Sequence, residues 1–273
     1  METSQESNEN EFQKIVYEKL GLTIYAALNT PKEKIVENIT ANVQRGLPQA
    51  WPHAEQDTPI ALCAGGPSLV DTLDEIRGIQ EAGGKVVALA NTAHFLVENG
   101  ITPNCHVLLD AHPNPEWIVP DLNCTYLIAS QCDPSTFDAV ADRDHVHIWH
   151  AINNEKELEV VGQHYDKWVP IQGGNTISLR AFNLFSTLGF HVFEVFGMDG
   201  CFLDDRHHVY EQPDADDIKT TYMDCNGRRF KVTGWMIQQA MEFMRTVKIF
   251  GQDWRMRVHG NGLIAHMVRT GGS

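Results

Sequence analysis

Short apolar segments recur along the chain from Pro59 onward, and helical or polar stretches separate them. Several are apolar at consecutive positions, which is typical of strands buried on both faces of a sheet. The predicted strands are Ile60–Cys63, Lys85–Ala90, His106–Leu109, Thr125–Ala129, His145–Trp149, Val192–Phe196 and Met256–Val258. Helical segments are predicted near 69–81, 92–99, 176–188 and 235–250. This alternation predicts an α/β, Rossmann-like fold with a mostly parallel sheet and helices on both of its faces.

The chain before Pro59 lacks this alternation. Residues 1–10 are polar and acidic and are expected to form a disordered tail. Glu11–Leu20 and Pro31–Arg45 show helical periodicity, so 11–57 is predicted to be an N-terminal helical segment and linker. The expected organisation is a helical appendage followed by a Rossmann-like nucleotide-binding catalytic domain over 58–273.

The charge balance limits the class of ligand. The sequence has 21 Lys and Arg residues against 36 Asp and Glu residues, a formal net charge of −15. Proteins that grip duplex nucleic acid neutralise its phosphates with a basic face. The composition therefore disfavours nucleic acid, without excluding a local basic patch, and fits a small ligand or a neutral acceptor better than a polyanion. The oligomeric state stays open, a homo-oligomer included.

The sequence carries no sign of export. No apolar run approaches the roughly 20 residues of a membrane span. The N-terminus lacks the basic and apolar regions of a signal peptide, so a cytoplasmic location is expected. The six cysteines form no C-x-x-C pair and are expected to act as reduced, small apolar residues.

Polar and glycine-rich segments follow several of the predicted strands. In parallel α/β sheets, ligands bind at the carboxyl ends of the strands, near a switch in strand order. The strand ends carry 64–68, Asn91, Asp110–His112 and 197–208, and the turn 173–176 precedes a predicted helix. This convergence predicts that the site lies at that edge of the sheet.

Two glycine turns are candidate nucleotide-binding elements. Gly65, Gly66, Pro67 and Ser68 lead from a strand into a helix, and Gly174, Asn175 and Thr176 lead into another. Glycine lets the backbone approach a ligand closely, and unpaired N–H groups at a helix start attract phosphate. Each turn can equally be a tight bend with a capping residue. The first is neither the G-x-G-x-x-G nor the P-loop pattern.

Carboxylates and imidazoles supply the candidate chemistry. Asp110 and Asp199 each stand at a strand end, where they can orient a ribose or base, hold a metal ion or cap a turn. His207 and His208 lie in a dense polar cluster, with His208 slightly favoured as the general base. We predict His208, His207 and Asp199 as catalytic residues. The metal ligands are unknown, and Mg²⁺ stays an open option.

The helix near 235–250 is predicted to pack against the core. Trp235, Met236, Met241, Phe243 and Met244 resemble a packed helix face rather than part of a site.

Taken together, these segments resemble the 6-hydroxymethylpterin diphosphokinase MptE-like family, which also includes the motility-associated (Maf) glycosyltransferases. The resemblance covers about 58–265. It is carried by the motifs Cys63–Leu69, Ala90–Ala93, Asn99–Pro103, Leu109–Asp110, Gly173–Asn175, Leu188–Gly200 and His207–Tyr210.

The same order of motifs is similar to that of bacterial sialyltransferases that use a CMP-activated sugar. That similarity implies that the nucleotide is held by Gly65, Gly66, Pro67, Ser68, Asn91, Gly174 and Asn175. It loosely matches His207 or His208 to a histidine base. Asp110 stands where those enzymes have Asn, so the identity of the nucleotide is open. The pterin kinases have a more acid-rich strand end than Asp110 followed by Ala111, His112 and Pro113.

The first functional hypothesis is therefore a transferase that moves a sugar from a nucleotide-sugar to an acceptor hydroxyl. The second is a Mg-ATP-dependent diphosphokinase that acts on a hydroxymethylpterin-like substrate. The third is a non-catalytic nucleotide-binding module. The sequence identifies neither the donor sugar nor the acceptor.

Overall fold

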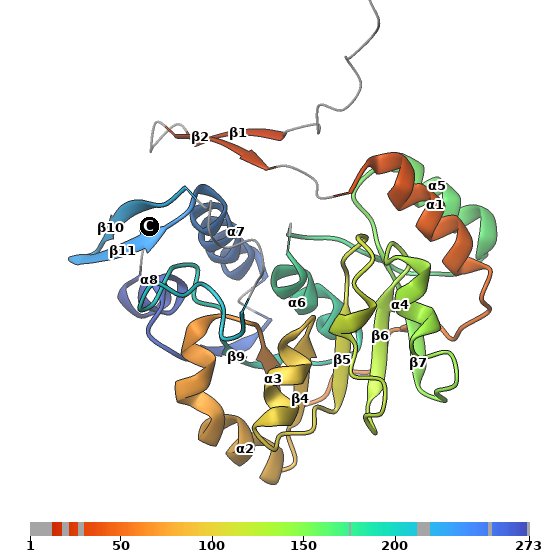
Figure 1. Cartoon of the computed structure of the whole chain (residues 1–273), viewed down its shortest axis with the longest axis horizontal. Helices are drawn as coiled ribbons and strands as arrows, with labels where there is room; N and C mark the ends of the chain where they lie inside the picture. Colours follow the sequence, from red (N-terminus) through yellow and green to blue (C-terminus); the bar gives the residue numbers. More distant parts are fainter. Residues whose placement is uncertain are drawn as a thin grey trace, which may run out of the picture.

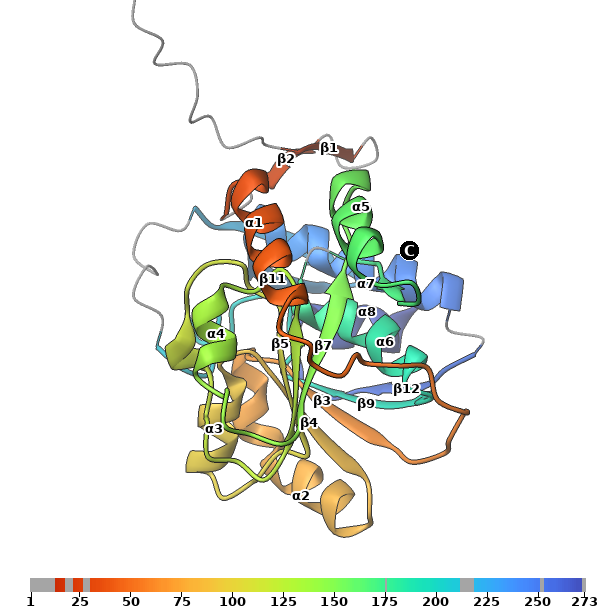
Figure 2. The same cartoon turned by 90° about the vertical axis from the view of Figure 1, so that its right-hand side faces the viewer.

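The apolar segments form one eight-stranded sheet in which every neighbouring pair of strands is parallel (Figures 1 and 2). The computed structural model describes residues 13–17, 22–26, 30–174, 176–211, 219–250 and 253–271. In spatial order the strands are β12 (Arg255–Val258), β9 (Val192–Phe196), β3 (Ile60–Cys63), β4 (Lys85–Leu89), β5 (Cys105–Leu108), β6 (Thr125–Ala129), β7 (Val146–Ala151) and β8 (Pro170–Ile171). The predicted α/β fold with a parallel sheet is confirmed.

Helices cover both faces of the sheet because its central strands are apolar on both sides. Side chains alternate along a strand, so Leu62 belongs to one buried cluster and its neighbour Cys63 to the other. The helices of the fold are α2 (Leu73–Glu81), α3 (Thr92–Glu98), α4 (Pro134–Asp138), α5 (Glu155–His164), α6 (Ile177–Thr187), α7 (Gly234–Phe250) and α8 (Leu263–Thr270), with 3₁₀ turns η1 (Pro67–Thr72) and η2 (Pro115–Trp117). The cluster that contains Cys63 packs against α2 and α3. The cluster that contains Leu62 packs against α6, α7 and α8.

The strand order places a switch point beside β3. From β3 the chain proceeds outward through β4 to β8, then returns to lay β9 and β12 on the other side of β3. The connections from β3 and β9 run to opposite sides of the sheet, and parallel α/β sheets commonly form a crevice at such a position. The turn after Cys63 and the loop after Phe196 meet there.

Helix α1 (Lys32–Val43) is built into the domain rather than appended to it. It packs side by side with α5 (Figures 1 and 2), and Ile39 lies fully buried in their shared cluster. The side-chain amide of Asn38 donates to the carbonyl oxygens of Ala111 and Gln131, both at 3.0 Å. The side-chain amide of Asn42 donates to the carbonyl oxygens of Ser130 and Cys132. The helix predicted over Pro31–Arg45 thus covers the carboxyl ends of β5 and β6.

Several sequence predictions differ from the structure. The helix predicted over Glu11–Leu20 is wrong, because the backbone forms a hairpin of β1 (Gln13–Tyr17) and β2 (Leu22–Ala26). The polar stretch after Gly200 contains a second hairpin, β10 (Thr221–Cys225) with β11 (Arg228–Val232). The predicted tail over 1–10 lies outside the described residues.

Candidate active site

A pocket lies at the crevice between β3 and β9, where the loops from the two strands are joined by backbone hydrogen bonds. Gly66 donates its N–H to the carbonyl oxygen of Gly197 at 2.7 Å, and Ala64 donates to Phe196 at 2.9 Å. The pocket has a volume of about 80 Å³. Its lining is Ala64, Gly65, Gly66, Ser178, Gly197, Met198, Asp199, Gly200, Cys201, His207, His208, Trp235, Met236 and Gln239. The predicted residues that meet here are Gly65, Gly66, Asp199, His207 and His208.

Close packing of the loops requires glycine at Gly65 and Gly66. A Cβ atom on Gly66 would lie 2.4 Å from the carbonyl oxygen of Gly197. On Gly65 it would lie 2.5 Å from the hydroxyl oxygen of Tyr210. Both distances are shorter than any normal contact, so these glycines bring the backbone against the rest of the site.

The N–H groups of this turn are engaged within the protein. Gly66 donates to Gly197, Ser68 donates to the Oδ2 atom of Asp199 at 2.9 Å, and Pro67 has no N–H group. Pro67 and Ser68 are buried at the start of η1 and do not line the pocket. The expectation that this turn offers unpaired donors to phosphate is therefore wrong for Gly66 and Ser68. What the turn contributes to the pocket is the bare backbone of two glycines.

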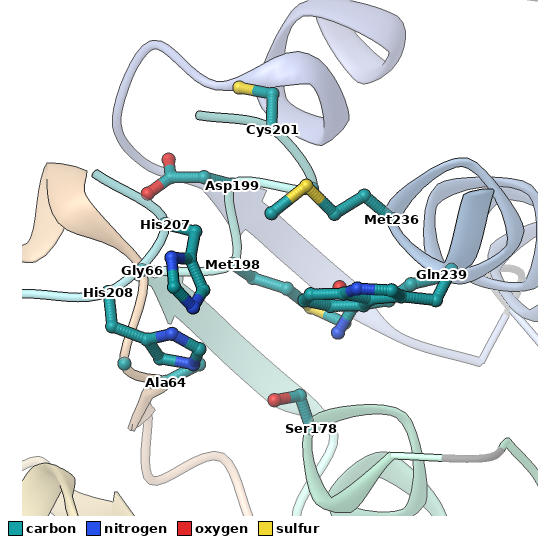
Figure 3. Close-up of a pocket in the computed structure, with 14 residues that line it drawn as sticks. Ala64, Gly66, Ser178, Met198, Asp199, Cys201, His207, His208, Met236 and Gln239 are labelled. Atoms are coloured by element: carbon teal, nitrogen blue, oxygen red, sulfur yellow. The ribbon is translucent and has the colours of Figure 1, made fainter. Parts of the chain in front are cut away.

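Asp199 fastens the glycine turn to the other elements. Its side chain is only 4% exposed and accepts the hydrogen bond from Ser68, and its backbone carbonyl accepts from Ile264 at 3.1 Å. A Cβ atom on Gly262 would lie 2.5 Å from its Oδ1 atom. Burial raises the pKa of this carboxyl, and the hydrogen bond from Ser68 opposes the rise. In Figure 3 the carboxylate turns away from Gln239.

A tight turn directs the two histidines back toward the glycines. Asp204 and Asp205 have positive φ values of 48° and 61°, and the residues on either side of them exchange backbone hydrogen bonds. Aspartate tolerates this left-handed conformation better than most residues. The chain then continues through His207 and His208 to Val209, whose N–H donates to the carbonyl oxygen of Gly65 at 2.8 Å. His207 and His208 therefore lie between the tight turn and the hydrogen bond of Val209.

The half-buried imidazole of His208 lines the pocket. Its ring centroid lies 4.6 Å from that of His207 and 5.3 Å from that of Tyr210. Among the described residues, its Nδ1 atom is buried without a hydrogen-bond partner. Burial, with a smaller effect of His207, lowers the pKa of His208 to about 4, so the ring is neutral at pH 7. Burial raises the pKa of Tyr210 to about 12, which keeps that phenol protonated.

The second glycine turn is organised by Arg180, a residue that sequence reasoning missed. Its Nε atom donates to the Gly173 carbonyl at 3.2 Å, and its Nη2 atom donates to the Gly174 carbonyl at 3.0 Å and to the Asn153 side chain at 2.7 Å. Arg180 is 5% exposed, and its Nη1 atom has no partner in the part of the chain that the structure describes. Burial lowers its pKa, and Glu157 opposes this shift. An arginine within the apolar run of α6 was the available sequence signal.

Thr176 connects this turn to the pocket. Its hydroxyl caps α6 by accepting from the N–H of Leu179 at 3.3 Å, and it accepts from the Gln239 side chain at 3.4 Å. The first N–H groups of an α-helix have no partner within the helix, and Ser178 of this first turn lines the pocket. Gly174 lies outside the lining, and Asn175 lies outside the described residues.

Asn91 and Asp110 are not among the residues that line the pocket. Asn91 precedes α3 and makes no side-chain capping bond there. The Oδ1 atom of Asp110 accepts the N–H of His112 at 3.0 Å, which is the turn-capping alternative considered for it. Nucleotide binding by Asn91 and Asp110 stays a prediction.

Helix α7 supplies lining residues that sequence reasoning had assigned to the core. Met236 and Phe243 are buried as predicted, but Trp235 is 42% exposed and lines the pocket together with Gln239. Residues one helical turn apart share a face, so the spacing of Trp235 and Gln239 was a usable signal. The prediction that Trp235 packs in the core is wrong.

The structure also bears on metals, cysteines and membranes. Within the described residues, no group of three or more His, Cys, Asp or Glu side chains is placed to hold a metal ion. All six cysteines are free, and five are buried as expected of small apolar residues. Among the helices described, none has the length and apolarity needed to cross a bilayer.

A second, larger groove of about 560 Å³ lies away from this edge. It is bounded by α6, β8 and the segments before β9 and β12, and includes His191 and Trp254. His191 precedes β9, so the groove reaches the amino end of that strand, opposite to the end where the candidate chemistry converges.

Comparison with known proteins identifies the family. Residues 33–205, more than half of the chain, match the family described as 6-hydroxymethylpterin diphosphokinase MptE-like. The chain belongs to this family. The predicted resemblance is confirmed, but its range differs from the predicted 58–265 at both ends. The match includes most of α1 and ends at residue 205, before the His207–Tyr210 motif.

The structure of this MptE-like protein resembles that of a Maf glycosyltransferase from Magnetospirillum magneticum AMB-1. The TM-score is 0.66 at 16% sequence identity, and the likeness covers 86% of this chain and 38% of the other. Such a low identity shows a shared fold, and the chain spans well under half of that protein. No curated protein sequence matches the chain.

Proposed function

We propose that this MptE-like protein is a transferase that moves a sugar from a nucleotide-activated donor to an acceptor hydroxyl. The observation that carries the proposal is the position of His208. The neutral imidazole of His208 lines a pocket at the switch point of a parallel sheet, next to the bare backbone of Gly65. Among the described residues, its buried Nδ1 atom has no hydrogen-bond partner. Of the histidines with such a nitrogen in the described part of the chain, His208 is the one that lines this pocket.

The start of α6 is the element best suited to the donor's phosphate. Its first N–H groups point out of the helix end, and the positive end of the helix dipole favours an anion. The buried Arg180 donates hydrogen bonds to the carbonyl oxygens of Gly173 and Gly174, so its positive charge lies next to this turn. Asn91 follows β4, the strand next to β3, so the nucleoside would extend along the sheet edge toward Asn91.

In the proposed reaction, the acceptor oxygen attacks the anomeric carbon of the donor sugar. Its proton passes to His208 as the new C–O bond forms. The bond between the anomeric carbon and the phosphate oxygen breaks, and the electron pair leaves with the nucleotide. Asp199 acts here as a support for the glycine turn, because its carboxylate is occupied by Ser68.

The family description supports a second candidate, a diphosphokinase that transfers pyrophosphate from Mg-ATP to a hydroxymethylpterin-like substrate. Such transfer relies on metal ions and cationic side chains to neutralise phosphate charge. The pocket lining, as far as the structure describes it, contains one carboxylate, Asp199, and no Lys or Arg. These residues do not fit a magnesium-bound triphosphate well, which is why sugar transfer is preferred.

Thermal shifts with CMP, UDP, GDP and ATP, with and without Mg²⁺, identify the nucleotide, because a ligand of the folded state raises the Tm. Release of nucleotide from the matching nucleotide-sugar then measures turnover. We expect His208→Gln to lower turnover at least about a hundredfold while the nucleotide-induced Tm shift remains.

The exposed His145, in the loop before β7, provides the control variant His145→Gln, which should keep full turnover. Unchanged turnover in His208→Gln would exclude the assignment. AMP release that strictly requires Mg²⁺ and ATP would favour the diphosphokinase. Nucleotide binding without any turnover would indicate a non-catalytic module.

A further inference from the structure

We infer that the acceptor is a neutral sugar whose ring stacks on Trp235 at the mouth of the pocket. This inference rests on the proposed function and adds to it the class of the acceptor. It is carried by three lining residues: Trp235 and Gln239 of α7, and Ser178 of α6.

Trp235 lines the pocket, whereas the apolar residues that follow it in α7 are buried in the core. The next two residues, Met236 and Ile237, are 2% and 3% exposed, whereas Trp235 is 42% exposed. Helix α7 therefore turns its apolar stripe to the core and leaves Trp235 at the rim. An indole face offers a large, rigid surface on which the C–H face of a sugar ring can pack.

Polar groups of the right kind lie beside the indole. Gln239 is one helical turn from Trp235, and its amide nitrogen donates to the hydroxyl of Thr176, which orients the side chain. Ser178 adds a hydroxyl from the facing helix. In Figure 3, Gln239 and Ser178 border the space in front of His207 and His208. An aromatic plane flanked by amide and hydroxyl groups matches a sugar ring, which has an apolar face and a polar rim.

The charge and position of this wall favour a neutral acceptor over the donor. The one acid of the described lining, Asp199, accepts a hydrogen bond from Ser68, and this part of the lining contains no Lys or Arg to recognise an anionic ligand. Met236 and Gln239 lie across the pocket from Ala64 and Gly66 (Figure 3). A ring on Trp235 would thus place its hydroxyl toward the histidines, while the phosphate occupies the start of α6.

The test measures sugar binding directly by saturation-transfer NMR, with the methyl glycosides of glucose, galactose and mannose as probes. Each probe is added to the full chain with the nucleotide that gives the largest thermal shift. We expect at least one glycoside to bind, and Trp235→Ala to weaken it about tenfold. Trp235→Phe, which keeps an aromatic face, should retain most of the binding.

Trp51 provides a matched control, because it is 43% exposed and does not line the pocket. Trp51→Ala should bind the glycoside as the unmodified protein does. The inference is overturned if no glycoside binds, if Trp235→Ala binds as well as Trp51→Ala, or if the nucleotide displaces the glycoside. Stacking of 6-hydroxymethylpterin on Trp235 in place of the glycosides would also overturn it. Absence of any nucleotide thermal shift would instead contradict the proposed function.

Discussion

The carboxyl edge of the sheet has two halves, of which one is covered by a helix and the other opens into a pocket. At β5 and β6 the edge is covered by α1, whose Asn38 and Asn42 amides donate to loop carbonyls at 2.7 to 3.0 Å. At β3 and β9 it opens into the pocket that holds His208. In both halves, polar residues follow buried strands, so the strand-end segments have similar sequence patterns.

The difference teaches that polar residues at strand ends come together around a pocket where no helix covers them. On the covered half, the amides of α1 satisfy the backbone oxygens, and Asp110 caps its own loop. On the open half, the backbone of Gly65 and Gly66 and the imidazole of His208 line the same pocket. Three predictions test this contrast.

The largest effect is expected from Gly66→Ala, on the open half. The new methyl group would lie 2.4 Å from the Gly197 carbonyl and 2.5 Å from the Asp199 carboxylate, so the two loops must separate. We expect a loss of at least about 3 kcal/mol in the free energy of unfolding, together with loss of nucleotide binding. Urea unfolding and the nucleotide thermal shift measure the two effects.

A glycine in α2 provides the control for this variant. A methyl group on Gly78 would contact nothing within 4 Å, so Gly78→Ala should stabilise the protein by up to about 1 kcal/mol. If Gly66→Ala were as stable as the unmodified protein, the close packing of the two loops would be disproved.

A smaller effect is expected from Asn42→Ala, on the covered half. The change leaves the carbonyl oxygens of Ser130 and Cys132 without their donor in a buried place. We expect a cost of about 2 kcal/mol in the free energy of unfolding, with unchanged nucleotide affinity, since α1 does not line the pocket. Thr40→Ala, on the exposed side of the same helix, should cost much less. A matching loss of nucleotide affinity in Asn42→Ala would show that the two halves are coupled.

The smallest effect concerns the titration of two histidines, His208 on the open half and His150 on β7. Burial, assisted by a neighbouring histidine, lowers the pKa of each to about 4. As the pH falls from 6.5 toward 4, the unfolded chain takes up protons that the folded chain refuses, so both residues reduce stability over that range. An anionic nucleotide should raise the pKa of His208 and leave that of His150 unchanged, as followed by ring-proton NMR. Equal shifts at both histidines would contradict a local site at His208.

The sheet was predictable because its strands are continuous apolar runs bounded by turn residues. Ile60–Cys63, Thr125–Ala129 and Val192–Phe196 have the predicted bounds in the structure. The hairpin of β10 and β11 was not predictable in this way, because β10 is polar and mostly exposed and is held by pairing with β11. Helix α5 was missed as well. Its first turn carries Glu157, a charged residue that is buried and whose carboxylate accepts hydrogen bonds from Asn153 and Asn154.

The candidate site was predictable as a set of strand-end residues, but not as a pocket. Asp199 and His208 were found because parallel strands deliver their carboxyl ends to one edge. Arg180 and Trp235 were missed because each lies within a helix whose pattern reads as core. Whether such a residue packs, organises a turn or faces a ligand depends on neighbours that are distant in sequence.

By itself, the sequence determined the parallel sheet and the edge at which polar groups gather, since these follow from the period and order of apolar runs. Its short motifs indicated the family. Only the tertiary structure decided which part of that edge is open. That choice depends on α1, whose two asparagine amides meet backbone carbonyls some 70 to 90 residues away in sequence. Contacts at that separation leave no local pattern, because any helix with two spaced asparagines has the same appearance.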